Sequence, residues 1–217
     1  MDKGRKLIIA GNWKMNKTVA EALDLVNGLK RDLGNIKEID IVVCPPFTAL
    51  SDVSKAILNT NIRLGAQNMS EHNFGAYTGE IAAGMLKEFS VRYVILGHSE
   101  RRQYQKETDE LIAKKALAAH AASRCASVSP TQTIWAIGTG KNATADQAQD
   151  AHMFIRKQLA AMFNETVARH ARIQYGGSVK PSNARELMSQ RDVDGALVGG
   201  ASLEDRNFSD IIKNCVN

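Results

Sequence analysis

The chain has 217 residues, of which 44% are hydrophobic, 24% charged and 6% aromatic. This composition is close to the average of soluble globular proteins, and it excludes a collagen-like repeat, a disulfide scaffold and a wholly disordered chain. A formal charge of +5 without a long run of Lys or Arg gives no sign of a nucleic-acid-binding arm, and it suits small anionic substrates. We expect one domain over residues 1–217, because single cores grow to ~250–300 residues before chains divide.

Short runs rich in Ile, Val and Leu alternate with longer helical patterns, which is typical of repeated β-α units around a parallel sheet. The predicted strands are Leu7–Ala10, Ile39–Cys44, Ile62–Ala66, Tyr93–Leu96, Ala171–Tyr175 and Gly195–Val198. Pro181 opens a predicted helix through Met188. A second helix is predicted from Ala145 to Met162, with a capping box at Thr144 and a core-facing stripe of Ala148, Ala151, Ile155, Leu159 and Met162.

The stretch 121–133 interrupts this alternation. It is small and polar, with room for at most one strand, at 124–129, and for no helix.

The sequence also limits the cellular setting. Cys44, Cys125 and Cys215 are odd in number and far apart, with no metal-ligand spacing. No stretch approaches the ~18 consecutive apolar residues of a membrane span, and Met1–Lys6 leads directly into a predicted strand instead of a secretory signal. We therefore expect a cytoplasmic protein with reduced thiols, no metal and no membrane contact.

Polar or glycine-rich clusters follow several of the predicted strands. They are GNWKMN (11–16), GHSERR (97–102), YGGSV (175–179) and GGAS (199–202), and WAIGTGK (135–141) lies between two of the strands. Because active sites of such α/β proteins lie at the carboxyl ends of the strands, we expect the clusters to form one site. A nucleotide-binding loop is excluded, since Asn142 follows Gly140-Lys141 and Trp135 stands where that motif needs glycine. No cofactor is predicted.

The strings NWKMN, GAYTGE, LGHSERR, WAIGTGK, YGGSV and LVGGASL resemble, in order, the motifs of the triose-phosphate isomerase family. The resemblance covers residues 7–120 and 134–212. It implies an α/β fold of the TIM (β/α)8-barrel type. It also implies the glycolytic and gluconeogenic interconversion of dihydroxyacetone phosphate and glyceraldehyde 3-phosphate, in which a proton moves between adjacent carbons through an enediolate.

The resemblance also assigns the expected site residues. Lys14 matches the family lysine that places a positive charge beside the substrate, and Asn12 matches an asparagine that donates a hydrogen bond near the reacting oxygens. His98 matches a neutral histidine that polarises the carbonyl. Glu100 matches a second carboxylate that is expected to pair with Lys14. Its role can be either a structural ion pair or a part in catalysis, and both alternatives stay open. The phosphate grip matches Gly138, Ser178, Gly199 and Gly200, where backbone N–H groups can approach an anion closely.

Two departures from the family pattern bear on activity. Gln132 stands where the family has the glutamate that takes the proton, and an amide cannot replace a general base worth ~10²–10⁴-fold in rate. A full barrel also runs to ~250 residues, and the shortfall coincides with the stretch 121–133. We therefore expect about seven strands and a truncated, opened or strained barrel at this junction.

Segment 73–80 resembles the family loop that docks into a second subunit, so we expect a homodimer; an ordinary surface loop is the alternative. Three hypotheses for function stay open: a shortened isomerase of reduced turnover, an inactive protein that binds phosphorylated ligands, and a non-functional truncated variant.

Overall fold

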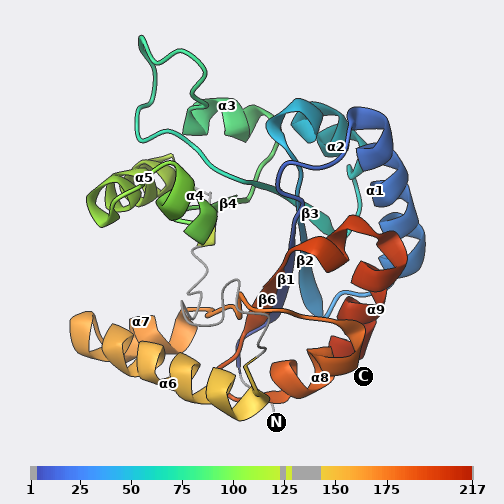
Figure 1. Cartoon of the computed structure of the whole chain (residues 1–217), viewed down its shortest axis with the longest axis vertical. Coiled ribbons are helices and arrows are strands. Elements are labelled where there is room, and N and C mark those ends of the chain that lie inside the picture. The colour runs from blue at the N-terminus through green and yellow to red at the C-terminus, as the bar shows by residue number, and fades with distance from the viewer. Residues whose placement is uncertain (1–3, 123–125, 129–142, 217) are drawn as a thin grey trace.

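A computed structural model of the chain describes residues 4–122, 126–128 and 143–216 (Figure 1). The strands are β1 (Leu7–Asn12), β2 (Ile39–Cys44), β3 (Ile62–Ala66), β4 (Tyr93–Ile95), β5 (Ala126–Val128) and β6 (Gly195–Val198). The helices are α1 (Val19–Leu33), α2 (Leu50–Ala56), α3 (Ala83–Glu88), α4 (Ser99–Tyr104), α5 (Asp109–Ala121), α6 (Ala145–Met162), α7 (Glu165–His170), α8 (Pro181–Ser189) and α9 (Asp205–Val216). In the described residues, 3₁₀ turns also span Phe47–Ala49 and Gly200–Leu203.

The described strands form one parallel sheet in the order β5-β4-β3-β2-β1-β6. The predicted strand Ala171–Tyr175 does not form a regular strand, yet it continues the sheet beyond β6. Tyr175 N–H donates to Gly195 O at 2.8 Å, Leu197 N–H donates to Tyr175 O at 2.9 Å, and Asp194 N–H donates to Ile173 O at 2.8 Å. With this segment the described residues supply the seven strand positions that the sequence predicts.

The two faces of the sheet bury different sets of side chains, because successive residues of a strand point to opposite sides. One set lies on the concave side: Ile8, Ala10, Val42, Cys44, Tyr93, Ile95 and Leu197. The alternate residues, among them Ile9, Ile41 and Val43, join the larger core with α1, α8 and α9. This is the inside and outside of a barrel wall.

Contacts across the concave side show that the sheet is strongly curled. Arg172 precedes the segment that pairs beyond β6, so it lies three strands away from Asp40 on β2. Three spacings in a flat sheet would separate these strands by about 14 Å. Arg172 Nη1 nevertheless donates to Asp40 Oδ2 at 2.5 Å, and Tyr93 OH approaches the same oxygen at 3.4 Å.

Helices cover the outside of the curled sheet as an incomplete ring. They pack side by side in the order α2, α1, α9, α8, α6 and α7. In Figure 1 the arc continues beyond α2 through α3 to the pair α4–α5, so that α4–α5 and α6–α7 lie at its two ends, and no described helix lies between them. Among the described residues no hydrogen bond joins β5 to segment 173–175. The described structure is thus a partly opened barrel of the TIM type.

Helix α6 has the predicted bounds and the predicted capping box, in which Gln147 N–H donates to Thr144 Oγ1 and Gln147 Oε1 accepts from Thr144 N–H. Its expected core stripe is correct only at the beginning of the helix. Ala148 is buried, whereas Met162, at the other end, is 71% exposed. The far end of α6 is followed directly by α7, and the two helices pack against each other.

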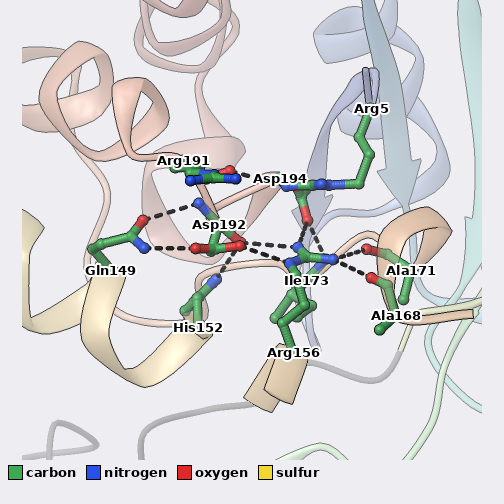
Figure 2. Close-up of polar contacts among 10 residues, drawn as sticks. All are labelled: Arg5, Gln149, His152, Arg156, Ala168, Ala171, Ile173, Arg191, Asp192 and Asp194. Atoms are coloured by element: carbon green, nitrogen blue, oxygen red, sulfur yellow. Dashed lines mark hydrogen bonds and ion pairs between the residues drawn. The ribbon is translucent and has the colours of Figure 1, made fainter. Parts of the chain in front are cut away.

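An ion-pair network joins α6 and α7 to the strand ends opposite the predicted site (Figure 2). Arg156 on α6 donates through Nε to Asp192 Oδ1 at 2.8 Å and through Nη2 to Asp194 Oδ2, and its Nη1 donates to the carbonyls of Ala168 and Ala171. Asp194 is buried and also accepts from Arg5 Nε at 2.7 Å. This network fixes the helix pair to the sheet with almost no access to water.

Candidate active site

The strand ends bring the clusters from four parts of the sequence to one edge of the sheet. Asn12 and Lys14 end or follow β1, and His98 and Glu100 lie just beyond β4. Gly199 and Gly200 follow β6, and Ser178 follows the segment that pairs beside it. Because all the strands are parallel, their carboxyl ends meet at one edge. The expected convergence is therefore produced by the topology.

Lys14 connects two of these clusters. Its Nζ forms an ion pair with Glu100 Oε1, and both side chains are less than half exposed. On the other side, a Cβ placed on Gly199 would lie 3.8 Å from Lys14 Cε. The lysine thus lies between the carboxylate after β4 and the glycine turn after β6, and it brings a positive charge to that turn.

His98 is buried at the beginning of α4, where its Nδ1 accepts a hydrogen bond from the Glu100 backbone N–H at 3.2 Å. An Nδ1 that accepts carries no proton, so the proton of the neutral ring is on Nε2. Burial lowers the pKa of His98, and the charge of Lys14 lowers it further against the opposing effect of Glu100. The imidazole is therefore a neutral donor at pH 7, and its approach to the Glu100 carboxylate, at 3.6 Å, is not an ion pair.

Asn12 is buried at the end of β1, and its Oδ1 accepts from Lys14 N–H at 3.1 Å. This hydrogen bond fixes which end of the amide is the acceptor. The Nδ2 group is therefore the donor end of this side chain.

Ser202 stabilises the glycine turn after β6. Ser202 is buried, and both its N–H and its Oγ donate to Gly199 O, at 2.8 and 2.7 Å. Above the turn there is space, since nothing lies within 4 Å of a Cβ placed on Gly200. Ser178 is exposed at the adjacent strand end, where its carbonyl accepts from Asn183 Nδ2. The turn is therefore open at Gly200 and has Lys14 beside it at Gly199.

Two expected site residues, Gly138 and Gln132, lie outside the described residues. Sequence reasoning also missed one contact of this site. Gln67, directly after β3, donates through Nε2 to the carbonyls of Lys14 and Cys44, both at 2.9 Å. A single Gln after a strand gives no pattern by which the sequence could have identified it.

In the described part of the chain, no group of three or more His, Cys, Asp or Glu residues could hold a metal ion.

No helix formed by the described residues has the length and apolar character needed to cross a membrane.

Comparisons with known proteins point to one family. The family model described as triosephosphate isomerase matches residues 7–126 and 132–215. A protein named triosephosphate isomerase from Alkaliphilus oremlandii is 47% identical over 246 positions, which cover 96% of this chain and 99% of the relative. Those from Endomicrobium trichonymphae and Carboxydothermus hydrogenoformans are each 44% identical, covering 96% and 98% of this chain and 98% and 100% of the relatives.

The same comparisons locate the shortfall in length. An alignment of 246 positions is longer than the 217 residues of this chain, so the relative carries residues without a counterpart here. The family match is interrupted at residues 127–131, within the stretch where the sequence predicts the missing part.

Proposed function

The chain belongs to the triosephosphate isomerase family, and we propose that it interconverts dihydroxyacetone phosphate and glyceraldehyde 3-phosphate with reduced turnover. The observation that supports this most directly is the position of Lys14 between Glu100 and the Gly199 turn, close to the neutral His98. One small edge of the sheet thus offers a cation, an open glycine turn and a neutral donor. A phosphorylated triose needs these three features.

In the proposed reaction, the phosphate group lies against the Gly199–Gly200 turn and Ser178, together with Gly138, which lies outside the described residues. Lys14 supplies positive charge beside it. The Nε2–H of His98 and the Nδ2 of Asn12 donate to the two substrate oxygens that share the developing charge of the enediolate. A neutral imidazole suits this task, since it stabilises the oxygen without giving up its proton early. Glu100 holds the Lys14 ammonium in place.

Removal of the substrate proton is the weak step. Gln132, at the family's base position, cannot take a proton, and a general base contributes ~10²–10⁴-fold. This substitution favours a second candidate function, in which the chain binds phosphorylated ligands with no useful turnover. Both candidates require the same grip on the ligand, and they differ only in the rate of proton transfer.

Binding of a phosphorylated ligand at this site is tested by titration with 2-phosphoglycolate, a small phosphorylated carboxylate that resembles the enediolate in charge. We expect saturable binding by the wild-type chain and a loss of at least tenfold in Lys14→Met, because a charge-assisted contact contributes about 1.5–3 kcal/mol. Lys37→Met is the matched control, since Lys37 is exposed before β2, at the opposite edge of the sheet. Equal loss in both variants, or no binding by the wild type, would contradict the proposal.

Turnover decides between the two candidates. Isomerisation of glyceraldehyde 3-phosphate by the wild-type chain, above the rate of Lys14→Met, supports the enzyme. Binding of 2-phosphoglycolate without such turnover supports the ligand-binding protein. If the chain shows no binding of 2-phosphoglycolate and no cooperative unfolding transition, the result supports a non-functional truncated variant.

A homodimer is part of the proposal. The segment 73–80 exposes Phe74 at 88% and Tyr77 at 45%, and Tyr77 stacks on His72 with ring centroids 3.8 Å apart. Met15, beside Lys14, is 97% exposed. Such large apolar side chains are often covered by a partner. Sedimentation velocity should show a dimer that Phe74→Ser weakens; an unchanged sedimentation coefficient at all concentrations would contradict this role for the loop.

A cytoplasmic location is also proposed, supported by Cys44, a buried thiol whose pKa burial raises to about 12. An inert thiol of this kind is typical of reducing compartments.

A further inference from the structure

The backbone of Lys14 has an unusual conformation. Its φ is 51°, in the left-handed region that residues other than glycine rarely adopt. Such a conformation persists only where the surroundings enforce it. This φ sets the direction in which the Lys14 side chain leaves the backbone, toward Glu100 and the Gly199 turn.

Two side chains hold the peptide groups on either side of Lys14. Asn12 Oδ1 accepts from Lys14 N–H at 3.1 Å, and Gln67 Nε2 donates to Lys14 O at 2.9 Å. The same Nε2 donates to Cys44 O at 2.9 Å, and this carbonyl also accepts from Trp13 N–H at 3.2 Å. Gln67 therefore joins the chain leaving β1 to the end of β2, from its own place at the end of β3.

Because Lys14 follows β1 by two residues, the ladder between β1 and β2, which ends at Asn12 and Cys44, does not constrain its carbonyl. The described contacts of that carbonyl include only the Gln67 amide. Without this hydrogen bond the peptide after Lys14 can rotate, and φ can return to the negative values that an L-residue prefers.

We propose that Gln67 is a positioning residue for the isomerase site, which holds Lys14 in its left-handed conformation so that the ammonium lies between Glu100 and the phosphate turn. The inference rests on the proposed function for its effect on ligand binding. Its structural part, the control of the Lys14 backbone, does not.

The chain offers a closely matched control. Asn61 also donates through one side-chain amide to two carbonyls, Leu33 O and Ile36 O, both at 2.6 Å. It lies before β3, at the edge of the sheet away from the site. Gln67→Met and Asn61→Leu each remove an amide that joins two backbone carbonyls, and each keeps a side chain of similar size. A purely structural role for Gln67 predicts the same consequences for both variants, namely reduced stability alone.

The experiment measures binding of 2-phosphoglycolate, well below the melting temperature, for wild type, Gln67→Met, Asn61→Leu and each change combined with Lys14→Met. We expect Gln67→Met to weaken binding about tenfold and Asn61→Leu to leave it unchanged. In the Lys14→Met background, Gln67→Met should cause no further loss, because the group that it positions is gone. Equal effects of Gln67→Met with and without Lys14 would overturn the proposal.

A second readout needs no ligand. The backbone chemical shifts of Lys14 report the sign of its φ, and they should change in Gln67→Met but not in Asn61→Leu. If Gln67→Met does not fold, Gln67→Asn is used, in which an amide one methylene shorter cannot reach both carbonyls. Unchanged Lys14 shifts in a folded Gln67 variant would overturn the proposal. Changed shifts in a protein that does not bind 2-phosphoglycolate would instead uphold the role of Gln67 and contradict the proposed function.

Discussion

Replacement of Arg156 by Met is the sharpest test of how the helix pair α6–α7 is held. Met keeps most of the length of the side chain and removes the guanidinium that Figure 2 shows between Asp192 and Asp194. The side chains of Arg156 and Asp192 are 14% and 11% exposed, and that of Asp194 is fully buried. Water can therefore do little to replace the lost cation.

The expected loss of stability in Arg156→Met depends on the hydrogen-bond donors that the two aspartates keep. Asp194 keeps Arg5 and the N–H of Ile173 as donors, and Asp192 keeps Gln149. The carbonyls of Ala168 and Ala171 lose the Arg156 donor. Breaking a buried pair by removal of one partner costs about 3–5 kcal/mol, and the retained donors place this case near 4 kcal/mol.

Urea denaturation of wild type and Arg156→Met measures this loss directly. A melting temperature lower by roughly 8–16 °C should accompany it, from about 2–4 °C per kcal/mol for a chain of this size. Arg169→Met is the control, because Arg169 is exposed on α7, and a change within about 0.5 kcal/mol is expected there. A loss below about 1 kcal/mol in Arg156→Met would refute the argument that this network secures the helix pair.

Three further predictions follow from single contacts. Burial lowers the pKa of His98 below its ordinary value of 6.5, so the unfolded chain takes up this proton first as pH falls. Urea denaturation at pH 7, 6 and 5 should therefore show that wild type loses stability below about pH 6.5 and that His98→Gln loses less. An equal dependence of stability on pH in the two proteins would contradict this. In Gly195→Ala the new Cβ would lie 1.9 Å from Ile8 O, at a φ of 155°, so we expect a loss above about 4 kcal/mol, and near-native stability in circular dichroism melts would refute it. Thr144→Ala removes the α6 cap and should cost about 1 kcal/mol in urea denaturation, with no change counting against the observed capping box.

Much of the sheet could be predicted because its strands are short apolar runs between polar segments. The bounds of Ile39–Cys44, Ile62–Ala66 and Gly195–Val198 are as the sequence indicates. β1 extends two residues further, to Asn12, because Gly11 and Asn12 pair with Val43 and Cys44, a tertiary effect. Tertiary pairing also decides the segment 171–175, which the sequence predicts as a strand. It is not a regular strand because it meets β6 at a single bridge.

The site was predictable to the extent that motifs name it. The strings NWKMN and LGHSERR place Asn12, Lys14, His98 and Glu100, and the structure brings the last three together. Helical periodicity gave the right bounds for α6 but the wrong burial for Met162, because periodicity cannot show that no described helix covers that end of α6. Gln67 could not be found, since its role depends on two carbonyls distant in sequence.

Steady-state isomerisation of glyceraldehyde 3-phosphate by Gln132→Glu and by wild type shows whether this chain keeps the family's binding geometry and lacks only its base. A carboxylate restored at that position should raise kcat/KM by about 10²–10⁴-fold, provided that Lys14 and His98 already hold the substrate in place. The same substitution in the Lys14→Met background should give a much smaller rise. Equal kcat/KM values for Gln132→Glu and wild type would show that Gln132 is not what limits proton transfer.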